Sequence, residues 1–370
     1  EILSEQHYNS FKDNCDAVGL TCELLIGNLS KKKKDEIAGK LKSGKIDIII
    51  GTHALIQENI TFKNLGLAII DEQHRFGVEH RKSLIKKAAD ANVLAMTATP
   101  IPRTLSMTLH GDMDISIIDE LPKNRIPIIT KVVNKDRLKS IYSFMKKEMD
   151  DKKQCYIVFP IIEESEKLDL EAAETGYQNI KKNIFPKYKV GYIHGKMKKE
   201  KRDEQMKLFI KGDINLLVST TVIEVGIDNP SATVMMIENA ERFGLTQLHQ
   251  LRGRIGRGAE QSYCILLQRK ETPIANHRLK VMENTSNGFK ISDEDLQLRG
   301  PGEFFGKRQH GYMKTKIADI TKDGDIIEQT RSLAFNIVQQ DYDLRSIEYQ
   351  KIKRELIYRY SNMLEFIDIG

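Results

Sequence analysis

Short apolar runs that end in small, polar or acidic residues constrain the fold of this chain most strongly. Charged stretches separate these runs, and in one of them Met206, Phe209 and Ile210 have the spacing of an amphipathic helix. Uninterrupted apolar runs are typical of strands covered on both faces, as in parallel sheets. The runs are residues 46–50, 67–70, 93–96, 155–159, 216–218 and 234–237. We therefore predict an α/β fold with functional side chains just after the carboxyl ends of its strands.

The chain divides at a proline-containing segment, Leu121–Pro127, which is typical of a linker. With 370 residues and ~100–200 residues per domain, two or three domains are expected. The strand pattern stops after about Lys270, and the rest is mainly helical with a predicted turn at Gly300–Gly302. We predict one α/β domain over residues 1–122, a second over 123–270, and a helical region over 271–370.

Several protein classes are excluded by what the chain lacks. No apolar run reaches the ~18 residues that cross a bilayer, so we expect no membrane span. The start, Glu1–Glu5, has neither the basic nor the apolar region of a signal peptide. The four cysteines form no C-x-x-C pair, which excludes a zinc ribbon and favours reduced core thiols in a cytosolic protein. His53, His110 and His194 lack metal-ligand spacing, so we assign no zinc.

An acidic pair follows the run at residues 67–70. Asp71 could hold Mg2+ and Glu72 could orient and deprotonate a water molecule, which is the chemistry of nucleotide hydrolysis. An ordinary exposed acidic turn is the alternative. The position at the end of a strand leaves both interpretations open.

Arginine and glycine alternate through Arg252–Gly258, which is poor material for a helix interior. Glycine permits close backbone approach, and guanidinium groups suit phosphate oxygens. A solvated basic loop is the alternative. The regular spacing would place several guanidinium groups on a single anion, so it favours arginine-finger chemistry.

A phosphate-binding P-loop is missing from this chain. The nearest match, Gly39–Ile46, lacks the hydroxyl that would bind Mg2+ and precedes a strand instead of following one. Lys31–Lys34 is interpreted as a solvated helix face. The net charge of +6 is compatible with a polyanionic partner without demanding one.

Taken in order, these segments resemble the motor of superfamily 2 helicases over nearly the whole chain. The similar motifs are Asp71–His74 (motif II), Thr97–Pro100 (motif III), Val218–Asp228 (motif V) and Gln250–Arg257 (motif VI). Within the superfamily the chain is most similar to the bacterial RecG family of ATP-dependent DNA helicases. The transcription-repair coupling factors share Thr97–Thr104 and part of motif VI, but Pro160–Ala173 and Leu298–Glu303 favour RecG.

The resemblance implies two RecA-like domains, then a helical hairpin and loop called the translocation motif. It implies ATP and Mg2+ as cofactors, with Asp71 on the metal, Glu72 and His74 in motif II, and Gln250, Arg254 and Arg257 on the phosphates. Gly226 and Asp228 would contact the nucleotide, while Thr97 and Thr99 would couple hydrolysis to movement. DNA phosphates would meet Thr220, Thr221 and the backbone amides of Gly51 and Thr52. Arg278, Arg299 and Gln309 match coupling residues of the translocation motif.

The implied partner is branched double-stranded DNA, such as forks and Holliday junctions. The implied setting is the bacterial cytoplasm, at the nucleoid, with the protein acting as a monomer in recombination and repair. A non-catalytic DNA-binding module or scaffold is the rival. That rival would not need the acids and arginines of an ATP site, which this chain keeps.

Two departures from the family pattern matter. Motif I, with the P-loop lysine and hydroxyl, is missing, and so is the N-terminal wedge domain. Glu1–Leu3 is similar to the interior of motif Ia. We therefore expect a C-terminal fragment that is inactive alone, with a first domain incomplete and poorly covered on one side.

Overall fold

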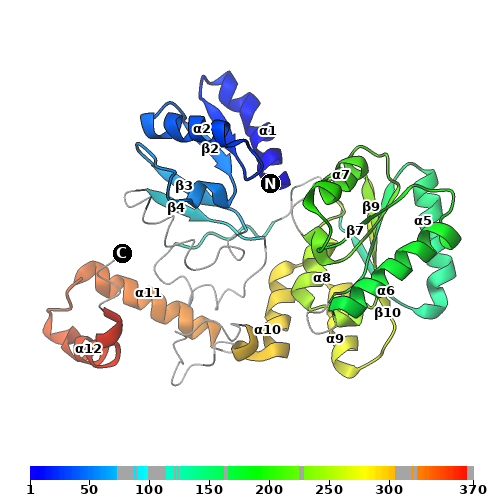
Figure 1. Cartoon of the computed structure of the whole chain (residues 1–370). Coiled ribbons are helices and arrows are strands. Elements are labelled where there is room, and N and C mark those ends of the chain that lie inside the picture. Colours follow the sequence, from blue (N-terminus) through cyan, green and yellow to red (C-terminus); the bar gives the residue numbers. More distant parts are fainter. Residues whose placement is uncertain are drawn as a thin grey trace. The chain divides into compact units, whose positions relative to one another are not determined.

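The computed structural model describes residues 1–72, 87, 91–98, 114–120, 122, 125–161, 166–224, 229–304, 319 and 323–364 (Figure 1). Residue contacts divide the chain into two compact units. One consists of Glu1–Pro100 with Leu121–Ile291, and the other of Ile101–Glu120 with Ser292–Gly370. The domain boundaries at residues 122 and 270 remain predictions.

The N-terminal part contains two parallel strand pairs, β1 with β2 and β3 with β4. Its elements are α1 (Ile2–Ala17), β1 (Cys22–Leu25), α2 (Lys31–Ser43), β2 (Ile48–Gly51), η1 (His53–Ile56), β3 (Leu67–Ile70) and β4 (Asn92–Ala95). Helix α2 begins where the Ser30 hydroxyl accepts a hydrogen bond from the Lys33 amide and ends at Gly44, in the left-handed conformation. Leu25, Ile37 and Leu41 form its small core.

The expectation that all apolar strands are covered on both faces is wrong for β3 and β4. In β3, Ala68 and Ile70 are buried, but the side chains of Leu67 and Ile69 are 53% and 57% exposed. Leu94 of β4 is exposed too. An apolar run favours a strand. The residues that pack against that strand decide whether its second face is covered.

The central part is a six-stranded parallel sheet with the order β5-β10-β9-β6-β8-β7. Its strands are β5 (Ile129–Asn134), β6 (Gln154–Val158), β7 (Val190–Ile193), β8 (Leu216–Ser219), β9 (Ala232–Ile237) and β10 (Tyr263–Gln268). Successive residues of β6 alternate between two cores: Tyr156 and Val158 pack in one, Cys155 and Ile157 in the other. Strands β6, β8 and β9 are buried throughout, so two-sided burial is confirmed there.

Helices and short turns connect these strands. They are η3 (Lys135–Arg137), α5 (Leu138–Asp150), α6 (Glu166–Asn179), η5 (Ile180–Ile184), α7 (Lys199–Ile210), η6 (Thr221–Glu224), η7 (Ala240–Arg242) and α8 (Leu245–Arg252). The helix predicted around Met206 is α7, in which Met206 and Phe209 are buried. The third residue of the pattern, Ile210, lies at the last turn of α7 and is 39% exposed. All four cysteines are free and buried, as expected.

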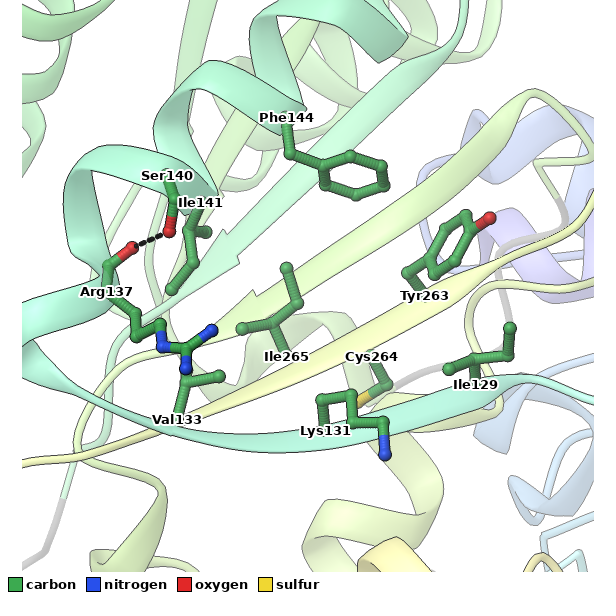
Figure 2. A pocket seen from close by; sticks show the side chains of 10 residues that line it. All are labelled: Ile129, Lys131, Val133, Arg137, Ser140, Ile141, Phe144, Tyr263, Cys264 and Ile265. Carbon is green, nitrogen blue, oxygen red and sulfur yellow. Dashed lines mark hydrogen bonds between the residues drawn. The ribbon is translucent and has the colours of Figure 1, made fainter.

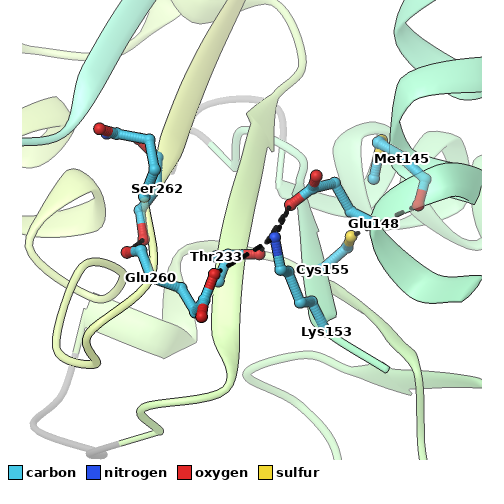
Figure 3. A network of polar contacts seen from close by, with 8 residues as sticks. Met145, Glu148, Lys153, Cys155, Thr233, Glu260 and Ser262 are labelled. Atoms are coloured by element: carbon cyan, nitrogen blue, oxygen red, sulfur yellow. Dashed lines mark hydrogen bonds and ion pairs between the residues drawn. The ribbon is translucent and has the colours of Figure 1, made fainter. Parts of the chain in front are cut away.

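A network of polar contacts among Glu148, Lys153, Thr233 and Glu260 connects the amino ends of β6, β9 and β10 (Figure 3). The Lys153 ammonium lies 3.2 Å from a carboxylate oxygen of Glu148 and 3.6 Å from one of Glu260. The Thr233 hydroxyl donates to Glu148 at 3.4 Å. Burial acts to lower the pKa of Lys153, but its hydrogen bond to Glu148 and the nearby carboxylates raise it overall. This network stabilises the sheet at the edge opposite its carboxyl ends.

The C-terminal part is helical, as predicted. It contains α9 (Pro273–Asn284), α10 (Gly288–Phe304), α11 (Gly324–Gln340), η8 (Ile347–Tyr349) and α12 (Gln350–Leu364). The turn predicted at Gly300–Gly302 is wrong, because α10 continues through these residues. Proline lacks an amide hydrogen, but its fixed φ is close to that of a helix. Among the helices described, none combines the length and apolar character needed to cross a membrane.

Candidate functional site

The acidic pair lies directly after β3, at its carboxyl end. The Glu72 amide donates to Oδ1 of Asp71 at 2.9 Å, and Oδ2 of Asp71 lies 3.6 Å from Nε2 of His7 on α1. Glu72 has φ +53°, a left-handed conformation that is uncommon for a residue with a side chain. The Asp71 side chain is 38% exposed, so its carboxylate can be reached from solution.

The donor set fits Mg2+ bound mainly through water. Mg2+ commonly uses one or two protein carboxylates and keeps several water molecules. Within the described ranges, no group of three or more histidine, cysteine, aspartate or glutamate side chains could hold a metal ion by itself. The exposed carboxylate of Asp71 is therefore suited to a magnesium–phosphate complex and unsuited to a fully protein-bound metal.

Thr97 shares this edge with Asp71. Strands β3 and β4 are parallel and in register, with Ile70 opposite Ala95, and the Met96 amide donates to the Ile70 carbonyl at 2.8 Å. Thr97 comes directly after this point, as the strand pattern predicted. The other predicted residues of motifs II and III, His74 and Thr99, lie outside the described residues.

Gly51 is the last residue of β2, the strand that pairs with β1, and Thr52 follows it directly. A Cβ atom on Gly51 would lie 2.3 Å from the Leu25 carbonyl oxygen, so only glycine fits there. The Thr52 amide donates to the same carbonyl at 3.3 Å. In this conformation the amide has an acceptor within the protein, and its contact with DNA phosphates stays a prediction.

The carboxyl ends of β7 and β8 bring His194 and Thr220 to neighbouring positions. The Thr220 amide donates to the carbonyl of Ile193, the last residue of β7, at 3.3 Å. The Thr220 hydroxyl and Nδ1 of His194 are buried, and neither has a hydrogen-bond partner among the described residues. Unsatisfied buried polar atoms are costly, and the described residues supply a partner to neither of these two atoms. Thr221 follows directly, at the start of η6.

Arg252 has a structural role that the alternating arginines and glycines did not indicate. It is buried, and its Nη1 donates to the carbonyl oxygens of Met282 and Thr285, both at 2.9 Å. Its Nη2 lies 3.3 Å from Nδ1 of His249. The expectation that the regular spacing places the arginines together on one anion is wrong for Arg252, which anchors the end of α9.

His249 accepts this contact in its neutral form. Burial, then the charges of Arg252 and Arg125, lower the pKa of His249 to about 4. At neutral pH the unprotonated Nδ1 can therefore accept a hydrogen bond from Arg252.

The remaining arginines of the loop differ in exposure. Arg254 is 8% exposed, while Arg257 is exposed and its Nε donates to the Gly253 carbonyl at 3.3 Å. Gln250 lies on α8, within the last turn before the loop. Arg257 is thus the guanidinium that a bound anion could reach with least rearrangement.

The other predicted residues are distributed as follows. Gly226, Asp228 and Gln309 lie outside the described residues, and Arg299 lies on α10. Arg278 of α9 donates through Nη1 to the Phe243 carbonyl at 2.9 Å and through Nη2 to the Glu241 carbonyl at 3.0 Å. These contacts give Arg278 a role in fixing α9 against the loop that follows β9.

A pocket of about 260 Å³ lies away from these residues, beside edge strand β5 (Figure 2). Its lining comes from β5, β10 and the start of α5. Only Lys131 and Arg137 among the lining residues carry charge. Its lining has no aspartate, glutamate or histidine, so it lacks the carboxylates that nucleotide hydrolysis uses.

Comparison with known proteins identifies the family of this chain. Three family models match: the DEAD/DEAH box helicase model over residues 1–108, the Helicase conserved C-terminal domain over 135–259, and "ATP-dependent DNA helicase RecG, domain 3, C-terminal" over 285–365. The third covers the part of the chain where the sequence favoured RecG over the transcription-repair coupling factors.

Curated relatives agree with these matches. The chain is 46% identical to the ATP-dependent DNA helicase RecG of Synechocystis sp., over 98% of this chain and 44% of the relative. It is also 46% identical to that of Bacillus subtilis, over 96% of this chain and 52% of the relative. A solved structure of RecG bound to a three-way DNA junction matches with a TM-score of 0.71 and 43% identity, covering 89% of this chain and 42% of that one. The chain spans about half the length of the curated relatives it matches.

Proposed function

The chain belongs to the RecG family of ATP-dependent DNA helicases, and from this premise we propose that it forms the motor part of an ATP-driven translocase that remodels branched double-stranded DNA. It contains two RecA-like helicase domains followed by a mainly helical region. The observation that carries the proposal is the acidic pair after β3, in a chain that aligns with RecG over nearly its whole length.

In the proposed ATP site, Asp71 would hold Mg2+, and Glu72 would orient and deprotonate the attacking water. The bound Mg2+ would supply charge compensation for the phosphates. Gln250, Arg254 and Arg257 are assigned to the phosphates, with Arg257 as the finger because it is the exposed guanidinium of the loop. Gly226 and Asp228 are assigned to the nucleotide, and His74 to motif II.

Hydrolysis is proposed to drive movement through motif III. Thr97 comes just after β4, beside the acidic pair's strand, which suits it to sense the state of the nucleotide. Thr99 is assigned the same role by its place in motif III. Arg278, Arg299 and Gln309 are proposed to pass this movement to DNA. Closure around ATP and opening after hydrolysis would then advance the motor.

We assign the DNA phosphates to the carboxyl ends of β7 and β8. We assign His194 to the phosphates together with Thr220 and Thr221. Nδ1 of His194 and the Thr220 hydroxyl are buried and have no hydrogen-bond partner among the described residues. The backbone amides of Gly51 and Thr52 remain proposed contacts with the DNA phosphates, and the Thr52 amide would exchange its bond to the Leu25 carbonyl for one to a phosphate. Contacts to phosphates predict binding that weakens steeply with salt and shows little sequence preference.

The proposed substrate is a fork or Holliday junction, in keeping with the RecG relative solved on a three-way junction. We place the protein, as a monomer, at the nucleoid in the bacterial cytoplasm. A non-catalytic DNA-binding module remains the competing outcome of the test below.

The test compares residues 1–370 with the same chain lengthened at its N-terminus through a P-loop, called here the extended protein. The sequence has no usable P-loop, so residues 1–370 should bind nucleotide weakly and show negligible turnover. The extended protein should hydrolyse ATP when branched DNA is added. An extended protein that folds and binds junction DNA without hydrolysing ATP would support the non-catalytic module instead.

A further inference from the structure

The loop that carries Arg254 and Arg257 is bonded to the segment that leads into β5. The Nε of Arg125 donates to the Gly256 carbonyl at 3.2 Å, although 131 residues separate the two along the chain. The acceptor lies between the two arginines of the loop. Arg125 therefore holds the backbone at the point from which Arg257 projects.

Packing reinforces this bond. Gly256 has φ +72°, and a Cβ atom there would lie 2.7 Å from Cγ1 and 3.0 Å from Cδ1 of Ile128. The side chain of Ile128 thus fills the space that a side chain at position 256 would need. On the other side of the loop, a Cβ on Gly258 would lie 2.6 Å from the Pro230 carbonyl oxygen.

Two further hydrogen bonds fix the ends of this contact. The Gln261 side chain donates to the Pro127 carbonyl at 2.9 Å, and the Ile129 amide donates to the Ser262 carbonyl at 3.0 Å. Hydrogen bonds therefore connect residues 125–129 to residues 256–262. The segment that leads into β5 is thus in direct contact with the loop that carries Arg254 and Arg257, called here the arginine loop.

Resting on the function proposed above, we propose that Arg125 is a positioning residue for ATP hydrolysis. It fixes the loop backbone so that Arg254 and Arg257 are placed for the phosphates. Because Arg125 belongs to the connecting segment, movement of that segment is transmitted to the arginine loop through the Gly256 carbonyl.

Arg125→Ala in the extended protein tests the proposal. We expect kcat for DNA-stimulated ATP hydrolysis to fall by about 10–100-fold, because small misplacements of catalytic groups have effects of this size. The KM for ATP should change by less than about two-fold, since the variant removes no proposed substrate contact. Arg125→Lys should recover part of kcat, because lysine can still donate to the Gly256 carbonyl.

Arg137→Ala is the matched control, since Arg137 is an exposed arginine at the start of α5 that lies away from the arginine loop. Its kcat should stay within about two-fold of the parent. A parallel measurement on residues 1–370 needs no activity. Amide hydrogen exchange at Arg254 and Ile255, which donate to the carbonyls of Leu251 and Arg252, should accelerate in Arg125→Ala and not in Arg137→Ala, with the urea midpoint unchanged.

The outcomes separate the two proposals. An extended protein without ATPase activity overturns the proposed function, and the exchange result then decides whether Arg125 orders the loop. Normal kcat in a folded Arg125→Ala variant overturns the positioning role, as does an equal loss in Arg137→Ala. A fall in the urea midpoint that accounts for the whole loss of activity would also reject it.

Discussion

Arg242 and Asp169 form a bidentate ion pair, in which Nη1 of Arg242 lies 2.8 Å from Oδ1 of Asp169 and Nη2 lies 2.9 Å from Oδ2. The pair joins η7 to α6, and the Asp169 side chain is only 9% exposed. Arg242→Ala leaves this carboxylate buried without its guanidinium partner. We expect the free energy of unfolding to fall by about 2–4 kcal/mol in urea denaturation.

The exposed pair of Arg345 and Asp343 provides the control, since these side chains are 80% and 49% exposed. Arg345→Ala should change the free energy of unfolding by less than about 1 kcal/mol. Equal effects of the two substitutions would show that burial does not strengthen the Arg242 pair.

His249 predicts a dependence of stability on pH. Its pKa falls from an ordinary 6.5 to about 4 in the folded chain, through burial and the charges of Arg252 and Arg125. The unfolded chain therefore binds a proton more readily, so stability is full above pH 6.5 and is lost as pH falls toward 4. The loss should approach about 2–3 kcal/mol, at ~1.4 kcal/mol per pKa unit.

The measurement is urea unfolding between pH 7 and pH 4, with His249→Gln as the comparison. Glutamine offers Arg252 an acceptor oxygen and does not titrate. The pH slope should be clearly shallower in this variant. The same slope in both proteins would mean that other groups cause the dependence.

Glu72→Gln and Arg257→Ala test the chemistry of the proposed site in the extended protein. Glutamine keeps the shape of Glu72 but removes the base, so ATP should bind while hydrolysis falls by orders of magnitude. Arg257→Ala should lower kcat by roughly 10³–10⁵, the range for an arginine finger. ATP binding by fluorescence and single-turnover hydrolysis separate the effects; turnover within a few-fold of the parent would refute both assignments.

Arg299→Ala or Gln309→Ala should uncouple the extended protein. ATP turnover should persist, because neither residue belongs to the proposed ATP site, while fork unwinding collapses. The two activities are measured on the same preparation. Unwinding that declines only in proportion to ATPase would leave these residues without a coupling role.

The sequence predicted β2, β3, β4, β6, β8 and β9. It missed β10, whose apolar run is unbroken, and β1, β5 and β7, whose runs are interrupted. Lys131 breaks the run in β5 and Gly191 falls within β7, so neither strand was predicted. Asp71 and Thr97 were predicted at a common sheet edge, because each follows an apolar run.

His194 was not predicted as a site residue, since its position beside Thr220 depends on the pairing of β7 with β8. The role of Arg252 could not be predicted either. Its acceptors are the backbone carbonyls of Met282 and Thr285, and every residue type has a carbonyl. A motif shows which side chains are present, but tertiary structure decides which of them face a ligand.

The anchoring of α9 by Arg252 has a consequence for dissecting this protein. A piece cut at Lys270 would keep the whole six-stranded sheet yet lose the carbonyl oxygens of Met282 and Thr285. Of the contacts that the described residues give Arg252, those with Thr130 and His249 would then remain. The last strand of the sheet is therefore a poor place to end an expressed fragment, and a soluble second domain should be sought only in pieces that extend beyond Thr285.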